Sequence, residues 1–273
     1  MAHYEKLQKI ISGNGFIAAL DQSGGSTPKA LLQYDVDQNY YTNETEMYDQ
    51  IHSMRARIVS SPSFNSKNII GAILFEMTMN KQINGKASAT YLWEDLGIVP
   101  FLKIDSGLEP EENGVHLLKN IYEIDKKLEI AVSKGIFGTK MRSVINSASE
   151  KGINEVVEQQ FKISEQINKY NLVPIIEPEI TISITDKENA EKILMKSILN
   201  NLDELPKDSK VILKLSLPEI MNFYLPLLDH PNVLRVVALS GGYDQKNALD
   251  KLRRNNGMIA SFSRALTEGL SIN

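Results

Sequence analysis

Eight short runs of apolar residues recur along the whole chain, and longer polar or amphipathic stretches separate them. The runs are rich in Ile, Val and Leu, and such continuous apolar character is typical of strands that are covered on both faces. We therefore expect eight strands, at Gly15–Asp21, Asn68–Glu76, Val99–Asp105, Phe137–Ser143, Leu172–Glu179, Lys210–Ser216, Val233–Ser240 and Met258–Ser263.

Helical patterns lie between these runs. Glu155–Lys169 places Val156, Phe161 and Ile167 on one face, and Lys187–Leu202 behaves similarly. Strands that alternate with helices indicate a parallel α/β architecture. Eight such units in 273 residues match a (β/α)₈ TIM barrel. A doubly wound open sheet is the alternative, because periodicity does not show closure.

The domain organisation follows from the absence of any composition break. No Pro/Gly/Ser-rich linker divides the sequence, so we expect one domain over residues 1–273. The last predicted strand leaves residues 264–273 for a closing helix. We therefore expect a truncated final helix, with a tail cut off or lost.

Composition excludes several classes of protein. The formal net charge is −4 and no basic tail is present, which argues against nucleic-acid and membrane-surface partners. The absence of Cys excludes disulfides, thiolate metal sites and a thiol nucleophile. Residues 1–11 lack the apolar core of a signal peptide, and no stretch approaches the roughly 18 apolar residues of a membrane span. We expect a cytoplasmic protein.

Charged residues gather at the carboxyl ends of the predicted strands, where the chemistry of a barrel is found. They are Asp21, Glu76, Lys103, Asp105, Lys140, Arg142, Glu177, Glu179, Lys214 and Arg264. Lys103, Lys140, Glu177 and Lys214 follow one another at intervals of 37 residues, one strand-to-strand unit, so we expect them at similar heights. An unpaired Lys is rarely buried among apolar residues without a reason.

These groups admit two interpretations. In one, the lysines merely form ion pairs with Asp105, Glu177 and Asp21, since structural networks can mimic active sites. In the other, a lysine of lowered pKa attacks a carbonyl to give a Schiff base, an electron sink that lets the adjacent carbon–carbon bond break or form. The carboxylates then move protons, and the other cations attract an anionic substrate.

Two glycine-containing segments predict anion sites. Ser240-Gly241-Gly242 follows the seventh strand and Ser263-Arg264 ends the eighth, and loops after these strands are the recurrent phosphate site of the fold. A second loop, residues 21–26, leads to Lys29 after the first strand. Two anion sites beside a reactive lysine suggest a sugar phosphate or bisphosphate. None of the four histidines ends a predicted strand, so we expect neither a metal nor another cofactor.

At these residues the sequence resembles the class I (Schiff-base) fructose-bisphosphate aldolases, closest to the short bacterial type, over its whole length. The matching segments, in family order, are FIAALDQSGGSTPK, GAILFE, VPFLKIDSGL, FGTKMRS, LVPIIEPEI, VILKLS, VVALSGG and ASFSRAL. The resemblance implies a metal-independent lyase of glycolysis and gluconeogenesis. Such an enzyme reversibly cleaves fructose 1,6-bisphosphate to dihydroxyacetone phosphate and glyceraldehyde 3-phosphate. It also implies a homo-oligomer.

The resemblance implies roles for individual residues. Lys214 matches the Schiff-base lysine, Glu177 the acid and base, Asp21 the aspartate that helps remove the C4 hydroxyl proton, and Lys140 the lysine beside the Schiff base. The phosphate of the dihydroxyacetone half falls at Ser240, Gly241, Gly242 and Arg264. The other phosphate and the substrate hydroxyls fall at Ser23, Ser26, Lys29 and Lys103, with Arg142 in the pocket and Glu179 beside Glu177.

The sequence departs from the animal-type members at two places. Ala30 stands where they have an arginine, and the chain lacks their terminal tyrosine. Two other functions stay open at this point. One is a Schiff-base aldolase or transaldolase that acts on another ketose phosphate, and the other is a non-catalytic sugar-phosphate binder.

Overall fold

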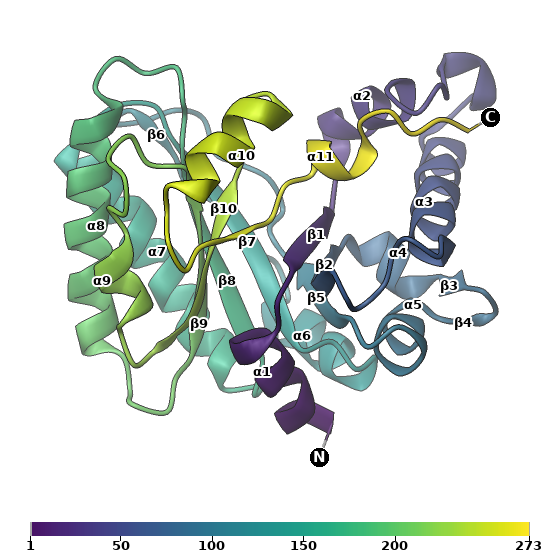
Figure 1. The fold of residues 1–273 in the computed structure, drawn as a ribbon, viewed down its shortest axis with the longest axis horizontal. Coiled ribbons are helices and arrows are strands. Elements are labelled where there is room, and N and C mark those ends of the chain that lie inside the picture. Colours follow the sequence, from purple (N-terminus) through teal and green to yellow (C-terminus); the bar gives the residue numbers. More distant parts are fainter. Residues whose placement is uncertain (1, 273) are drawn as a thin grey trace.

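The computed structural model of the protein describes residues 2–272, with the backbone alone at positions 264 and 265. In this part of the chain, eight parallel strands form one sheet in the order of the sequence, and the sheet curls into a nearly closed barrel (Figure 1). The strands are β1 (Phe16–Leu20), β2 (Ile69–Leu74), β5 (Val99–Lys103), β7 (Gly138–Ile145), β8 (Val173–Ile180), β9 (Val211–Ser216), β10 (Val233–Leu239) and β11 (Ile259–Ala260). The barrel prediction is confirmed, and the doubly wound alternative is wrong.

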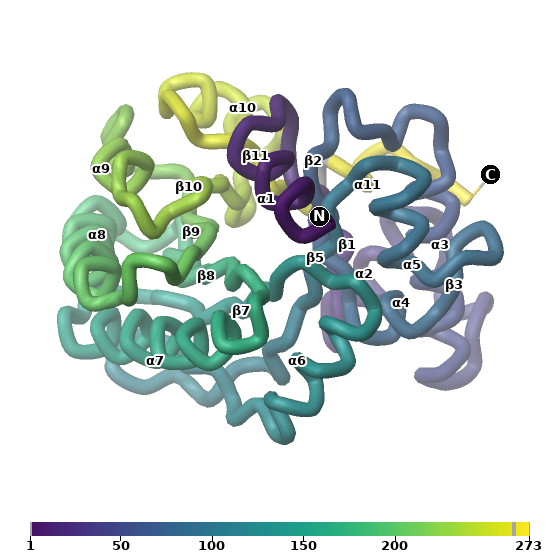
Figure 2. The backbone as a smooth tube through the Cα atoms, turned by 90° about the horizontal axis from the view of Figure 1, so that it is seen from below, coloured from purple at the N-terminus to yellow at the C-terminus, as the bar shows by residue number. Residues whose placement is uncertain are grey.

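Helices surround the strands, as the tube in Figure 2 shows. They are α1 (Ala2–Ser12), α2 (Thr27–Leu32), α3 (Glu44–Ser60), α4 (Glu76–Asn80), α5 (Ser88–Thr90), α6 (Ile124–Ser133), α7 (Glu150–Asn168), α8 (Lys187–Glu204), α9 (Leu225–Leu228), α10 (Gln245–Arg253) and α11 (Arg264–Thr267). Asn43, Ser149 and Asp244 cap α3, α7 and α10 by accepting a backbone N–H hydrogen bond. Among the described residues, no helix is both long enough and apolar enough to cross a bilayer.

Shorter elements decorate the loops. Two 3₁₀ turns, η1 (Gly24–Ser26) and η2 (Gln38–Tyr40), lie on either side of α2, and a π-helical turn η3 (Tyr91–Asp95) follows α5. β3 (Gln82–Ile83) and β4 (Lys86–Ala87) form a hairpin. β6 (Val115–His116) pairs antiparallel with the end of β7. With this pairing, β7 ends at Ile145, two residues beyond the predicted end at Ser143.

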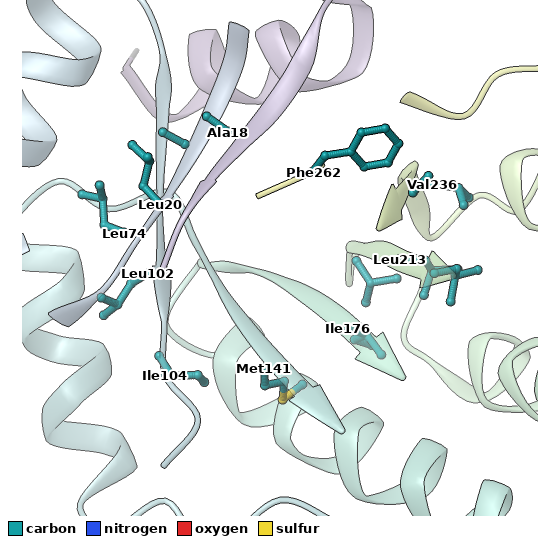
Figure 3. Close-up of a cluster of buried hydrophobic side chains, with 14 of the residues drawn as sticks. Ala18, Leu20, Leu74, Leu102, Ile104, Met141, Ile176, Leu213, Val236 and Phe262 are labelled. Atoms are coloured by element: carbon teal, nitrogen blue, oxygen red, sulfur yellow. The ribbon is translucent and has the colours of Figure 1, made fainter. Parts of the chain in front are cut away.

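Alternation along the strands divides the core into two layers. Side chains of one parity face the helices, and Figure 3 shows part of this outer layer. There Leu20, Leu74 and Leu102 are register partners on β1, β2 and β5. Side chains of the other parity fill the barrel interior; among them are Ile17, Ile73, Phe101, Ile175, Ile212 and Val237. Toward the carboxyl ends of the strands, the residues of this inner parity are charged. They are Asp21, Lys103, Lys140, Glu177 and Lys214, and alternation therefore places these charged groups inside the barrel.

Helix α1 covers the amino-terminal ends of the strands, in front of which it lies in Figure 2. Ile10 belongs to the interior layer, and the Lys6 ammonium donates to the Gly135 carbonyl at 2.6 Å. Arg235 of β10 donates to the carbonyls of Ile10 and Gly13 at 2.7 and 3.0 Å. These contacts close the amino-terminal end of the barrel interior.

The seam between β1 and β11 is held differently from the other strand junctions. Among the described residues, no backbone ladder joins these two strands. Instead the Gln22 amide, just after β1, donates to the Ser263 hydroxyl at 2.5 Å. The chain then runs past α2 and α3 (Figure 1), where the Ile272 N–H donates to the Tyr34 carbonyl at 3.1 Å.

Gly138, the first residue of β7, leaves room for the ring of Phe101 in the barrel interior. A Cβ added there would lie 2.1 Å from the Val173 carbonyl oxygen and 2.9 Å from the Phe101 ring. Overpacking of this kind costs about 1–3 kcal/mol. We expect Gly138→Ala to lower the melting temperature by about 5 °C, measured by circular dichroism. Gly25→Ala, where an added Cβ meets nothing within 4 Å, is the control. Equal melting temperatures would contradict the prediction.

Candidate active site

A pocket of about 870 Å³ opens at the carboxyl ends of the strands. The sequence-predicted site residues that line it are Asp21, Ser23, Ser26, Lys29, Lys103, Lys140, Arg142, Glu177, Glu179, Lys214, Ser240, Gly241, Gly242 and Ser263. The side chain of Arg264 lies outside the described part of the structure, although its backbone begins α11 directly after Ser263. The fold therefore collects on one surface residues that are spread over most of the sequence.

A chain of ion pairs forms the floor of the pocket. The Lys140 Nζ lies 2.7 Å from an Asp21 carboxylate oxygen and 3.0 Å from Glu177 Oε2. The Lys214 Nζ lies 3.0 Å from the other oxygen, Glu177 Oε1. All four side chains are buried, since each is at most 10 % exposed. Two carboxylates and two ammonium groups thus share one poorly hydrated space.

Burial and charge pairing oppose each other at these groups. Burial raises the pKa of Asp21, but Lys140 and Lys214 outweigh it and hold that pKa well below the usual range. For Glu177, burial is likewise outweighed by Lys140 and Lys214, so its pKa is lowered. Burial alone would lower the pKa of Lys140, yet Asp21 and Glu177 raise it. Lys140 is therefore a permanent cation between two ionised carboxylates.

The register of the strands relates the four evenly spaced groups to one another. Lys103 and Lys140 are register partners, as expected. Lys140, however, pairs with Ile175, so Glu177 lies two residues further along β8. The neighbouring pairing of Ile176 with Leu213 continues the same offset to Lys214 on β9. Strands of a barrel are staggered, and even spacing in sequence does not reveal where the stagger falls.

Glu76 does not belong to the site. It is the first residue of α4 rather than the end of a strand, and it is exposed, with Lys127 at 4.0 Å. The strand β2 ends at Leu74, two residues earlier than expected, because the chain turns into the helix at Phe75.

Two further ion pairs line the pocket walls. The Lys103 ammonium contacts the Asp105 carboxylate, and the Arg142 guanidinium contacts Glu179. The lysines thus do form pairs of the kind that a purely structural network requires. These pairs, however, surround a pocket large enough for a small molecule, and a structural network needs no such space. The pocket favours the active-site interpretation.

The Ser240-Gly241-Gly242 segment between β10 and α10 forms a tight turn. Both glycines have positive φ, 60° and 116°, and the Tyr243 N–H donates to the Ser240 carbonyl at 3.0 Å. Turns of this kind can direct backbone N–H groups toward an anion. A side chain at Gly241 would place its Cβ 2.7 Å from Ile182. Tyr243 is next in sequence, and its hydroxyl donates to Glu219 at 3.0 Å. This bond connects the loop after β10 to the segment that follows β9.

Two residues of the site were missing from the sequence-predicted set. Gln22 lines the pocket beside Asp21. Arg55 is fully buried on α3 and donates to the Gln22 carbonyl. Arg55 follows Ile51 by four residues and precedes Ile58 by three, and a cation on the apolar face of a helix could have signalled a buried polar partner.

No three His, Asp or Glu side chains of the described residues are grouped as potential metal ligands.

Comparison with known proteins gives concordant results. The class-I fructose-bisphosphate aldolase family model matches residues 4–220. The class 1 fructose-bisphosphate aldolase of Clostridium acetobutylicum is 56 % identical over 267 residues, which cover 98 % of this chain and 90 % of that protein. The Synechocystis enzyme of the same name is 52 % identical, with 98 % and 89 % covered.

A solved structure supports the fold. Fructose-bisphosphate aldolase from Plasmodium falciparum, in complex with TRAP and a small-molecule inhibitor, superposes with a TM-score of 0.69. The two chains are 19 % identical, and the match covers 97 % of this chain and 85 % of the other. This likeness supports the barrel architecture.

Proposed function

The chain belongs to the class-I fructose-bisphosphate aldolase family, and we propose that it reversibly cleaves fructose 1,6-bisphosphate through a Schiff base on Lys214. The products are dihydroxyacetone phosphate and glyceraldehyde 3-phosphate. The observation that carries the residue roles is the buried chain Asp21–Lys140–Glu177–Lys214, in which each neighbouring pair lies within 3.0 Å.

The contacts of the three pocket lysines single out the nucleophile. Lys140 lies between two carboxylates that raise its pKa, so it stays protonated. Lys103 is bound to both the carboxylate and the carbonyl oxygen of Asp105. Lys214 contacts Glu177 alone among the described carboxylates, and Glu177 can accept its proton. The neutral Lys214 amine is then free to attack a carbonyl.

The proposed reaction uses each group once or twice. Lys214 attacks the C2 carbonyl, and Glu177 donates a proton to the departing water as the Schiff base forms. The C4 hydroxyl proton passes to Asp21 or Glu177 while the C3–C4 electron pair moves into the protonated Schiff base. The aldehyde product leaves, the enamine is protonated at C3, and water releases the ketone product and Lys214. Lys140 remains charged and keeps both carboxylates in place.

The two ends of the pocket suit the two phosphates. We place the phosphate of the dihydroxyacetone half at the Ser240-Gly241-Gly242 loop and Ser263-Arg264, and the second phosphate near Ser23, Ser26 and Lys29. These residues line the same pocket, apart from the undescribed Arg264 side chain. The carbon chain would then lie across the lysines between them.

Removal of metal and reduction of the Schiff base test the proposal together. We expect cleavage activity to be unchanged in excess EDTA, because an iminium rather than a metal accepts the electrons. Borohydride added with dihydroxyacetone phosphate should abolish activity irreversibly, since the reduced amine cannot hydrolyse. A coupled assay for glyceraldehyde 3-phosphate measures both. Loss of activity in EDTA alone would refute the mechanism, and borohydride without dihydroxyacetone phosphate is the control.

The cytoplasmic location expected from the sequence and the homo-oligomer that the family resemblance implies are parts of the same proposal.

A further inference from the structure

Gln22 connects three parts of the structure at the seam of the barrel. Its Nε2 donates to the Ser263 hydroxyl at 2.5 Å and to the Ala19 carbonyl at 3.3 Å. Its Oε1 lies 3.5 Å from an Arg55 guanidinium nitrogen, which also donates to the Gln22 backbone carbonyl. Residues 241 positions apart in sequence thus meet at the wall of the active-site pocket.

The neighbours of the Gln22 side chain determine the orientation of its amide, that is, the positions of its nitrogen and its oxygen. The Ala19 carbonyl can only accept a hydrogen bond, so the amide nitrogen must face it. The Arg55 guanidinium can only donate, so the amide oxygen must face Arg55. Arg55 is itself fully buried, and its other terminal nitrogen is held by the Thr78 hydroxyl at 2.9 Å. The amide therefore presents an N–H, and never its oxygen, to Ser263.

This orientation determines the role of the Ser263 hydroxyl. A hydroxyl has one proton to donate and two lone pairs. Because Gln22 occupies a lone pair, the proton of Ser263 is left for another acceptor, and none is found for it among the described residues. Ser263 lines the pocket between β11 and α11, beside the loop at which we place a phosphate.

We propose that Gln22 is a positioning residue that makes the Ser263 hydroxyl an obligate hydrogen-bond donor to the phosphate of the dihydroxyacetone half. The inference rests on the proposed function. Gln22 does not touch the reacting carbons, and it acts through Ser263. Its contribution is therefore to substrate binding and not to the chemical step.

A double-mutant cycle tests this coupling. Gln22→Met keeps the length of the side chain and removes the donor. We expect it to raise KM about tenfold, the effect of one hydrogen bond to a charged group, and to change kcat by less than about twofold. Ser263→Ala should do the same. The double variant should be no worse than Ser263→Ala alone, because Gln22 acts on the phosphate only through the Ser263 hydroxyl. Effects that multiply would overturn the proposal.

A second substrate locates the effect. Fructose 1-phosphate retains the phosphate of the dihydroxyacetone half and lacks the other. Gln22→Met should therefore raise KM equally for both substrates. Lys29→Met should raise KM for the bisphosphate alone. Gln50→Met, on α3 and outside the pocket, is the matched control, since it removes an amide-to-carbonyl hydrogen bond to Tyr40. An increase confined to the bisphosphate would overturn the placement of Ser263.

Failure of the inference can be separated from failure of the proposed function. Calorimetry measures the binding of inorganic phosphate to the wild type and to the three variants of the cycle, in the absence of substrate and turnover. We expect Gln22→Met and Ser263→Ala each to weaken the binding of phosphate, and we expect their effects not to multiply in the double variant. A wild-type chain without aldol cleavage would count against the proposed function. Unchanged phosphate binding in Gln22→Met would count against this inference, whatever the activity.

Discussion

Replacement of Lys214 by Met is expected to lower aldol cleavage by about a thousandfold or more and to abolish trapping by borohydride. The variant loses the amine that becomes the Schiff base. Its fold should persist, because Met fills a similar volume and Glu177 keeps Lys140 as a partner at 3.0 Å. Mass spectrometry of the reduced wild-type protein should place the added dihydroxyacetone phosphate moiety on the peptide that contains Lys214.

The control for this variant is Lys162→Met, which changes an exposed lysine of α7. It should be trapped and should cleave substrate as the wild type does. Label on Lys103 or Lys140 in the wild-type protein would reassign the nucleophile. Full trapping of Lys214→Met would refute its role outright.

Replacement of Lys140 by Met is expected to have the largest effect on stability. The change leaves Asp21 without its partner at 2.7 Å and Glu177 with Lys214 alone. Removal of one member of a buried ion pair costs about 3–5 kcal/mol, because a charge stays buried without compensation. We expect a correspondingly large fall in the melting temperature at pH 7, and a loss of activity because both carboxylates lose the cation that orients them.

The pH dependence of this loss has a definite sign. The pKa values of Asp21 and Glu177 are lowered in the folded protein, where Lys140 is a leading cause. Their stabilisation is thus present above the pKa of an unfolded carboxyl, about 4, and is lost as the pH falls through the folded values. In Lys140→Met the two carboxyls take up protons at higher pH. The difference in melting temperature between wild type and variant should therefore shrink from pH 7 to pH 4.

An exposed pair provides the comparison for Lys140→Met. Lys192 and Glu188 lie 2.6 Å apart on α8, and both side chains are about half exposed. Surface pairs of this kind contribute about 0–1 kcal/mol, so Lys192→Met should change the melting temperature little at either pH. A difference for Lys140→Met that is equally small, or that does not vary with pH, would show that the carboxylates do not depend on Lys140.

Much of the fold follows from local features of the sequence. A run such as residues 69–74 is apolar on both faces, so it is a buried strand wherever it packs, and eight such runs alternating with helices form a parallel barrel. Strand parity then places Lys214 on the interior face with Ile212. Position at a strand end, together with the Ser-Gly-Gly turn, was enough to find most of the pocket lining.

The remaining features depend on strand register and on contacts between segments that are distant in sequence, so only the tertiary structure decided them. The two-residue offset between Lys140 and Glu177 arises from the stagger of the strands, which no periodicity encodes. Arg55 reaches the site from a helix, and Gln22 meets Ser263 across the seam. Hydrophobic pattern and turn chemistry act between near neighbours in sequence, so they determine elements and faces. Pairing of polar groups inside a barrel requires the positions of all eight strands at once, and these exist only in the folded chain.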